Sequence, residues 1–391
     1  MTGGILVLGG GFSGFWAALA ARRMAGELTP VTLVSRDPVL QMRPRLYETR
    51  PETLGVDLRP LLTIAGIGFV TDEANGIETR SRRVGLASGR ELSYERLVVA
   101  TGSVLRRPAV PGARFAHSID NQADAIAFDR RLAQIAQAII APTIAVVGAG
   151  FTGIELALEL RDRLAAHGGD PEGLRIVMID RAPVVGSELG AGPRGEIEAA
   201  LAAARVELRL GAAITALAAD HVAFADGAVL AAAAVVLTTG MAAADFTRHI
   251  PGEHDDLGRI VVDSGLRAPA APGVFVAGDA AAADTGDGHL ALQSCQHALQ
   301  LGRFAGENAA RDLLGMPLIT YRQLRYVTHL DLGRWGAVST NGWERAVRLT
   351  GQEAKALKRR INTEVIYPPG TASRAGLLAM SSTDPAEQRR P

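Results

Sequence analysis

The sequence has 391 residues, 48% of them hydrophobic and 21% charged, and its 41 Lys and Arg residues balance its 41 Asp and Glu residues. This length allows two or three domains with sizeable cores, and the neutral balance excludes the basic field typical of nucleic-acid-binding proteins. The only cysteine is Cys295, which excludes an internal disulfide, a dithiol redox pair and a multi-cysteine metal site, so no metal is expected.

The N-terminal segment predicts a dinucleotide-binding unit made of strand, turn, helix and strand. Residues 5–8 and 31–34 are apolar runs typical of strands, residues 9–14 form a glycine-rich turn, and residues 15–24 are helix-like. The segment lacks a basic region followed by an uninterrupted apolar stretch and a small-residue cleavage site. We therefore expect a cytoplasmic protein.

The first turn reads GGGFSG, with Gly9, Gly11 and Gly14 at the glycine positions of the GxGxxG pattern. Gly9 permits a tight turn, Gly11 lets a pyrophosphate approach the backbone, and Gly14 lets the helix pack closely on the strand. Phe12 and Ser13 lie at the helix start, where free N–H groups and a partial positive charge attract phosphate. The alternative is a purely structural turn in a glycine-rich chain.

The second strand of this unit ends at Ser35-Arg36 and not at the acidic residue that commonly binds a ribose. A hydroxyl beside a guanidinium suits a 2′-phosphate, so this site taken alone does not identify its nucleotide. Arg43 and Ala74, further along the same segment, are included among the expected nucleotide contacts.

Two later strands end in small residues, one at Ala100-Thr101-Gly102 and the other at Gly278-Asp279. The second of these follows far downstream, which fits a first domain that is discontinuous in sequence. The Asp279 carboxylate is then placed to bind the ribityl hydroxyls of a flavin. The alternative is a strand-end turn with an exposed aspartate.

The strand, turn, helix, strand order recurs in the middle of the chain and indicates a duplicated nucleotide-binding unit. Its turn carries Gly148, Gly150 and Gly153 at the pattern positions, with Phe151 and Thr152 between them. Two matched units make a coincidence improbable. The four segments are residues 143–147, 148–153, 154–166 and 174–179.

Asp180 follows the last of these strands, where a carboxylate accepts hydrogen bonds from a ribose and repels a 2′-phosphate. This position favours NADH over NADPH, although the neighbouring Arg181 weakens the inference. A further strand of the unit ends at Thr239-Gly240, as the equivalent strand of the first unit ends at Thr101-Gly102. These four small residues are expected to contact the two nucleotides.

The remaining segments complete the predicted organisation. Residues 227–244, the longest apolar run, favour a buried strand plus turn over a membrane span, and residues 290–314 predict a long helix. From Thr320 onward, aromatic residues and the basic stretch 355–360 predict a small C-terminal domain with a frayed tail from about Thr371.

The predicted fold class is α/β, with two Rossmann-like dinucleotide-binding domains and a small C-terminal α+β domain. The first domain is expected to be discontinuous. The boundaries are residues 1–115 and 255–319 for the first domain, 116–254 for the second and 320–391 for the third.

These features together resemble the two-dinucleotide-binding-domain flavoprotein superfamily over nearly the whole chain. The resemblance implies FAD in the first unit, NAD(P)H in the second, and a nicotinamide stacked on the flavin between them. Branches that use cysteines near the flavin are excluded, since residues 41–47 and most of the chain contain none. Residues 146–156 look like the GGGxTGVE segment of type II NADH:quinone dehydrogenases, including Thr152 and Glu155.

Residues 295–300, CQHALQ, are similar to the AQxAxQ segment with which those dehydrogenases flank the quinone headgroup. Gln296 and Gln300 lie four apart on one helix face and can present amides to a carbonyl oxygen; the alternative is two solvent-facing polar residues. The resemblance places Ser294 and Cys295 near the flavin ring, although a small buried core thiol is the commoner role for such a cysteine. Glu155 either orients the nicotinamide or is a buried acid on the packing face of its helix.

The segment 354–366 resembles the tail of ferroptosis-suppressor-type quinone reductases, in which a lysine approaches the flavin, and Lys358 is the better match. Two alternatives stay open for the basic residues around it. They form either a solvated helix face, which we favour, or a basic amphipathic helix on an anionic membrane.

We therefore expect an FAD-dependent NADH dehydrogenase that reduces a quinone, with Glu155, Gln296, Gln300 and Lys358 at the reacting centre. One alternative is a soluble reductase that donates electrons to a ferredoxin or rubredoxin or acts in secondary metabolism. A flavin-bearing redox sensor with little turnover is another. A peripheral membrane contact through the C-terminal domain and a homodimer both stay open.

Overall fold

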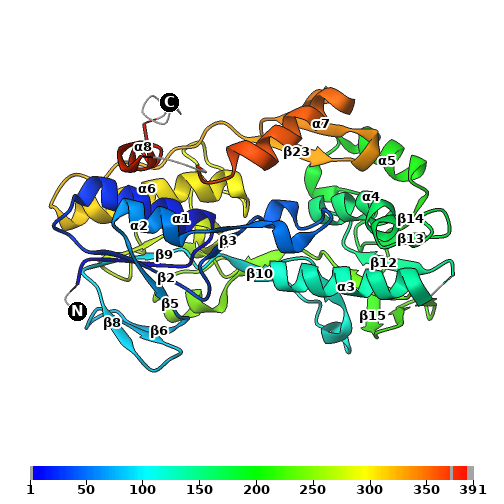
Figure 1. Ribbon diagram of the computed structural model, residues 1–391, viewed down its shortest axis with the longest axis horizontal. Helices are drawn as coiled ribbons and strands as arrows, with labels where there is room; N and C mark the ends of the chain where they lie inside the picture. The colour runs from blue at the N-terminus through cyan, green and yellow to red at the C-terminus, as the bar shows by residue number, and fades with distance from the viewer. Residues whose placement is uncertain (1–2, 139, 370–372, 385–391) are drawn as a thin grey trace.

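A computed structural model describes residues 3–138, 140–369 and 373–384. Figure 1 shows two layered α/β units side by side along the long axis, and the C-terminal segment runs from one unit to the other across their upper edge. This arrangement confirms the predicted α/β fold class with two parallel sheets.

The first unit is built on a parallel five-stranded sheet of order β21-β9-β1-β2-β5. All four residues of β1 are buried, as expected for a central strand of a parallel sheet that is covered on both faces. Four of its strands lie before residue 100, and the fifth, β21, comes from far downstream. Its strands are β1 (Ile5–Leu8), β2 (Val31–Ser35), β5 (Gly68–Thr71), β9 (Arg96–Val99) and β21 (Val274–Val276).

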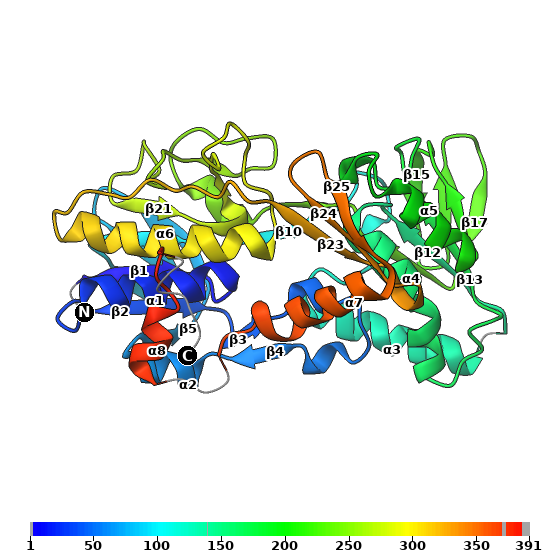
Figure 2. The same cartoon turned by 90° about the horizontal axis from the view of Figure 1, so that it is seen from above.

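Helices α1 (Phe12–Ala25) and α6 (Cys295–Leu313) lie side by side on one face of this sheet, as Figures 1 and 2 both show. The two backbones meet at Gly302 and Gly306, where a Cβ atom would lie 2.2 Å from the Ser13 oxygen and 2.0 Å from the Ala17 oxygen. Only glycine allows so close an approach. Smaller elements of this unit are α2 (Arg59–Ala65), β3 (Val39–Gln41), β4 (Gly55–Asp57), β6 (Ala74–Glu78), β7 (Arg83–Leu86), β8 (Glu91–Ser93), β20 (Ile260–Val261) and β22 (Ala281–Ala282).

The second unit has a parallel sheet of order β11-β18-β12-β13-β14. The two units are linked by the antiparallel pair β10 and β19, whose first residues follow the strand ends at Gly102 and Gly240. The elements are β10 (Ser103–Leu105), β11 (His117–Ser118), α3 (Gln122–Ala138), β12 (Thr143–Val147), α4 (Phe151–Ala166), β13 (Arg175–Ile179), α5 (Arg194–Ala203), β14 (Val206–Arg209), β15 (Ile214–Leu217), β16 (His221–Phe224), β17 (Val229–Ala231), β18 (Ala234–Leu237) and β19 (Met241–Ala243).

The C-terminal segment contains an antiparallel sheet, β23 (Val327–Asp331), β24 (Ala337–Asn341) and β25 (Ala346–Thr350), followed by helices α7 (Gly351–Arg360) and α8 (Arg374–Ala379). β23 and a short 3-10 turn after it contact α4 of the second unit, whereas α8 contacts α1 and α2 of the first. The C-terminal segment therefore touches both nucleotide-binding units.

Three sequence expectations need correction. The helix expected from residue 290 begins at Cys295, because Ser294 caps it by accepting a hydrogen bond from the His297 N–H at 3.4 Å. The run 227–244 contains the expected buried strand, β18, but also two further short strands, β17 and β19. The frayed tail is wrong for residues 374–379, which form α8 with Leu377 fully buried, while Thr371 lies outside the described residues.

Within the described ranges, no helix is both long and apolar enough to cross a membrane. The predicted domain boundaries stay a prediction.

Candidate functional site

A cavity of about 2540 Å³ runs between the two units and collects most of the predicted site residues. Of the predicted residues, only Gly14, Gly153 and Gly278 do not line it. These three serve close packing, since a Cβ at Gly14 would lie 1.8 Å from the Gly9 oxygen and one at Gly153 would lie 1.9 Å from the Gly148 oxygen. The residues predicted from the sequence come from distant segments of the chain, and in the structure they surround one cavity.

The first turn has the geometry of a phosphate cradle. Gly9 has a φ of 105°, and a Cβ there would lie 2.2 Å from the Ala100 oxygen. At Gly11 an added Cβ would meet open space within the described part of the chain, which leaves the backbone accessible. The Ser13 hydroxyl, 5% exposed, has no hydrogen-bond partner among the described residues. An orphaned buried hydroxyl at a helix N-terminus fits a bound phosphate group.

The second turn repeats this backbone, with a φ of 115° at Gly148. The carboxylate of Asp180 accepts hydrogen bonds from the Ala149 N–H at 2.7 Å and the Ala182 N–H at 2.8 Å. The acid expected at a ribose is thus held rigidly at the edge of the turn, and it lines the cavity.

Glu188 occupies the mouth of this second turn. Its Oε1 accepts a hydrogen bond from the Phe151 N–H at 3.4 Å, and a Cβ at Gly150 would lie only 2.5 Å from the same oxygen. A carboxylate oxygen here stands where a dinucleotide phosphate would accept from the helix N-terminus. At Gly11, the equivalent position of the first turn, an added Cβ would meet no atom of the described residues within 4 Å, so no described carboxylate covers that turn.

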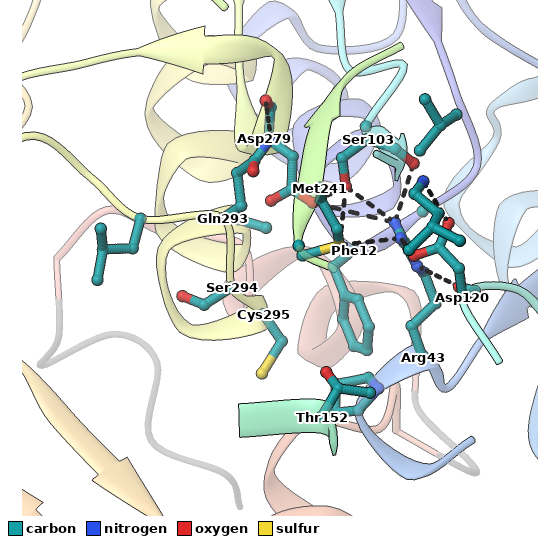
Figure 3. Close-up of a pocket in the computed structure, with 18 of the residues that line it drawn as sticks. Phe12, Arg43, Ser103, Asp120, Thr152, Met241, Asp279, Gln293, Ser294 and Cys295 are labelled. Atoms are coloured by element: carbon teal, nitrogen blue, oxygen red, sulfur yellow. Dashed lines mark hydrogen bonds and ion pairs between the residues drawn. The ribbon is translucent and has the colours of Figure 1, made fainter. Parts of the chain in front are cut away.

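A polar cluster surrounds Asp279, as Figure 3 shows. Asp279 Oδ2 accepts from the Ser103 hydroxyl at 2.6 Å and lies 4.0 Å from the Arg43 guanidinium, which also donates to Asp120. Burial raises the pKa of Asp279, and Arg43 and Ser103 oppose this rise. Since the side chain is only 14% exposed, the alternative of an exposed strand-end aspartate is wrong. A buried carboxylate with spare acceptor capacity fits flavin hydroxyl groups.

The N-terminus of α6 borders the same cavity. Figure 3 places Cys295 on the side of the helix that faces Phe12 and Thr152, and burial raises the pKa of its thiol. Cys295 is therefore a neutral, half-buried cavity residue and not a fully buried core thiol.

The two predicted glutamines also lie at this cavity and are only partly exposed. The Gln296 Nε2 atom is buried without a hydrogen-bond partner among the described residues. A buried amide donor that lacks an acceptor fits a ligand carbonyl oxygen. The alternative of two solvent-facing side chains does not hold.

Glu155 and Lys358 form a buried ion pair at one wall of the cavity, with Lys358 Nζ 2.9 Å from Glu155 Oε1. Their side chains are 4% and 7% exposed, and Oε1 also accepts from the Asp331 N–H at 3.0 Å. Burial raises the pKa of Glu155 to about 7, and Lys358 opposes this rise. Glu155 is thus both a buried acid and a cavity residue.

Lys355 and Lys358 do not belong to a solvated basic face, contrary to the favoured alternative. Lys355 pairs with Asp331, and Lys358 points inward over the Phe151 ring at 5.3 Å. A basic amphipathic helix on a membrane would also require both lysine side chains to be exposed on the protein surface. Of the four basic residues of this stretch, only Arg359 and Arg360 are exposed.

The remaining predicted contacts lie around the rim. A Cβ at Gly10 would lie 2.7 Å from the Ser35 hydroxyl, and the largely exposed Arg36 pairs with Glu73 at 3.8 Å. The Thr101 hydroxyl is buried without a partner among the described residues. Ala74, Gly102, Thr239 and Gly240 line the cavity, and the Thr239 hydroxyl donates to the Arg106 oxygen at 2.5 Å.

Sequence reasoning missed several residues that shape the site, namely Tyr47, Ser103, Asp120, Glu159, Glu188, Asp331 and Lys355. Ser103 carries a usable signal, because it directly follows the predicted site residue Gly102 and begins a strand. For the others, no local pattern exists. Only the tertiary fold brings Tyr47, Asp120 and Glu188 to the cavity. It also places Glu159, Lys355 and Asp331 outside the cavity, in the charged cluster that adjoins Glu155. The described residues contain no group of three or more His, Cys, Asp or Glu side chains able to hold a metal.

Comparisons with known proteins agree with this geometry. A family model described as pyridine nucleotide-disulphide oxidoreductase matches residues 4–302. The chain is 43% identical, over 99% of both chains, to an NADH dehydrogenase-like protein of Mycobacterium tuberculosis. It is 28% identical to the demethylphylloquinone reductase of Synechocystis, over 91% of this chain and 90% of that one.

Among solved structures, the sulfide:quinone oxidoreductase of Aquifex aeolicus matches with a TM-score of 0.76 at 19% identity. The match covers 92% of this chain and 90% of that one, and at this identity it shows the fold alone.

Proposed function

Since the chain belongs to the pyridine nucleotide-disulphide oxidoreductase family, we propose that it is an FAD-dependent NADH dehydrogenase that passes two electrons to a quinone. The observation that carries the proposal is the shared cavity, where both nucleotide turns and the pair Gln296 and Gln300 border one space. The relatives named NADH dehydrogenase-like protein and demethylphylloquinone reductase support it.

FAD, when bound, supplies the carrier that accepts hydride from NADH and passes the electrons to the acceptor. The first turn, with the unpartnered hydroxyl of Ser13, would hold its phosphates, and Asp279 its ribityl hydroxyls. Ser294 and Cys295 would border the flavin ring, where the N-terminus of α6 favours negative charge.

NADH would bind the second turn, with its ribose at Asp180, which favours NADH over NADPH. The Glu155–Lys358 pair would face the nicotinamide or the acceptor and hold a proton there. The two glutamines would donate hydrogen bonds to a quinone carbonyl oxygen. The single cysteine of the chain means that no disulfide within the chain takes part, whatever the name of the family.

The test is an anaerobic titration of the flavin-loaded protein with NADH and then NADPH, followed by a soluble quinone. We expect bleaching by NADH, weaker bleaching by NADPH, and full reoxidation by the quinone. The double variant Gln296→Ala/Gln300→Ala should keep the bleaching and lose most of the quinone reoxidation. Reoxidation by a rubredoxin or ferredoxin but not by the quinone would move the acceptor to a protein.

A peripheral membrane contact is proposed for the C-terminal segment, with a cytoplasmic location. Exposed Arg359 and Arg360 precede Val365, which is 51% exposed, by a few residues, and Arg360 pairs with Glu364 at 3.7 Å, so Arg359 supplies the positive charge beside this apolar surface. Cosedimentation with anionic but not with neutral vesicles would support the contact. Sedimentation velocity would decide whether the chain forms a homodimer.

A further inference from the structure

Two carboxylates on α4 face two lysines on α7. Glu155 and Glu159 lie one turn apart on α4, and Lys358 and Lys355 lie one turn apart on α7. The inner pair, Glu155 and Lys358, is 2.9 Å apart and buried, whereas the outer pair, Glu159 and Lys355, is 3.9 Å apart. The outer side chains are 17% and 30% exposed, so this row of charges runs from solvent to the cavity.

Asp331, at the end of β23, connects the outer and inner pairs. Its Oδ1 accepts from Lys355, and its N–H donates to Glu155 Oε1 at 3.0 Å. Its Oδ2 accepts from the Tyr47 hydroxyl at 3.1 Å, and Tyr47 also lines the cavity. With a side chain only 8% exposed, Asp331 is held between the solvent end and the cavity end of the row.

The cluster contains three carboxylates but only two lysines. If all five groups were ionised, it would carry one net negative charge in a poorly solvated place, which is costly. Burial raises the pKa of both Glu155 and Glu159 to about 7, and the lysines oppose this rise. The charge count and these pKa values both favour a cluster that holds one proton near neutral pH and releases it at higher pH.

The reduction of a quinone to a quinol consumes a proton of this kind. The quinone takes up two electrons and two protons to form a quinol, whereas NADH gives two electrons and one proton as hydride. The second proton must come from solvent, so the balance is NADH plus quinone plus one proton to NAD⁺ plus quinol.

We propose that Glu159, Lys355 and Asp331 form a proton-supply arm that carries a solvent proton to the Glu155–Lys358 pair while the acceptor is reduced. The inference rests on the proposed function and adds positioning residues outside the cavity. Glu159 takes up the proton at the partly exposed end of the row. Lys355, which lies between Glu159 and Asp331, and Asp331, whose N–H binds Glu155, link that end to the Glu155–Lys358 pair. Other charged or titratable groups that influence the cluster are Tyr47, Glu48, Asp162, Arg163 and His329.

The kinetic test compares acceptors that differ in their need for protons. Ferricyanide takes one electron and no proton, whereas a soluble quinone and dichlorophenolindophenol take two electrons with protons. In Glu159→Gln we expect turnover with the quinone and the dye to fall about tenfold. This is less than the roughly 10²–10⁴-fold that a directly positioned proton donor contributes, because Glu159 acts through Glu155. Ferricyanide reduction should stay unchanged, and the solvent isotope effect with the dye should rise.

A second readout needs no turnover. Infrared difference spectra of the holoenzyme between pH 5 and pH 9 should show a protonated carboxyl group that titrates near neutrality and weakens in Glu159→Gln. Lys355→Gln tests the same arm if the first variant folds poorly. Glu207→Gln, which removes an exposed carboxylate paired with Arg175 on a distant strand, is the matched control and should behave like wild type.

Equal slowing with all three acceptors would mean a structural role and overturn the arm. So would unchanged dye kinetics in both variants, or the absence of a carboxyl group titrating near neutral pH. If the wild type reduces the dye but no quinone, the proposed function fails, and the dye kinetics still decide whether the arm exists.

Discussion

In each nucleotide-binding unit a helix follows the glycine-rich turn, α1 in the first unit and α4 in the second. These two helices differ in how they contact the helix that lies over them, which we call the cover. On α1 the cover is α6, and the contact is backbone to backbone at Gly302 and Gly306. On α4 the partner is α7, and its side chains meet those of α4 as ion pairs, Glu155 with Lys358 and Glu159 with Lys355. The first cover, α6, is held by close backbone packing, and the second, α7, is held by ion pairs. We call them the glycine cover and the charged cover.

This difference matches what each unit is proposed to hold. A contact through glycine backbones does not respond to pH or to a bound charge, which suits a resident prosthetic group. A contact through buried charges responds to both, which suits a site where a charged substrate enters and leaves in every turnover. Substitutions at the two covers should therefore fail in different ways.

The largest effect is expected when the charged cover loses a cation. Lys358→Met leaves Glu155 buried without its partner, which should lower the unfolding free energy by about 3–5 kcal/mol at pH 8. Because the pKa of Glu155 then rises further, the carboxyl group accepts a proton at lower pH and the loss shrinks toward pH 6. Urea unfolding at both pH values measures this, and an equal loss at both would contradict it.

The titration of Glu159 should give the next largest effect. Burial raises its pKa from 4.5 to about 7, so between these values the folded protein holds a proton that the unfolded chain has released. The unfolding free energy of the wild type should therefore fall as pH rises across this range, relative to Glu159→Gln, by roughly 3 kcal/mol. Thermal unfolding at several pH values checks the sign, and parallel curves for the two proteins would refute it.

The glycine cover should be damaged by a single methyl group at any pH. Gly302→Ala places a Cβ 2.2 Å from the Ser13 oxygen, so α6 must move away from α1, at a cost of about 1–3 kcal/mol. Since Ser13 lines the cavity, we also expect weaker FAD retention, measured as the flavin-to-protein ratio after gel filtration. Gly195→Ala, on the exposed side of α5 with open space around it, should instead be neutral or stabilising.

The charged cover also shows where prediction from the sequence ends. Both glycine turns, their strands and Asp279 were predictable, because spacing along the chain sets that geometry. Glu155 and Lys358 were singled out separately, but their pairing was not, since it depends on how α7 returns over α4. Lys355 was expected on a solvated helix face, and Glu159 carried no signal at all, because helix periodicity does not reveal which charged residues a distant segment will bury.

The smallest expected effect concerns the mouth of the second turn, where the two units also differ. Glu188 accepts from the Phe151 N–H, so its carboxylate and a dinucleotide phosphate compete for the same helix N-terminus. Glu188→Gln removes the charge repulsion but keeps the size, and because the side chain is exposed, NADH binding should tighten by only about 0.2–1 kcal/mol. Calorimetry with NADH at low and at high salt measures this gain, which should shrink as salt screens the carboxylate. Weaker binding in the variant would mean that Glu188 contacts the bound dinucleotide and does not compete with it, so that the second turn would resemble the first more closely than its acid suggests.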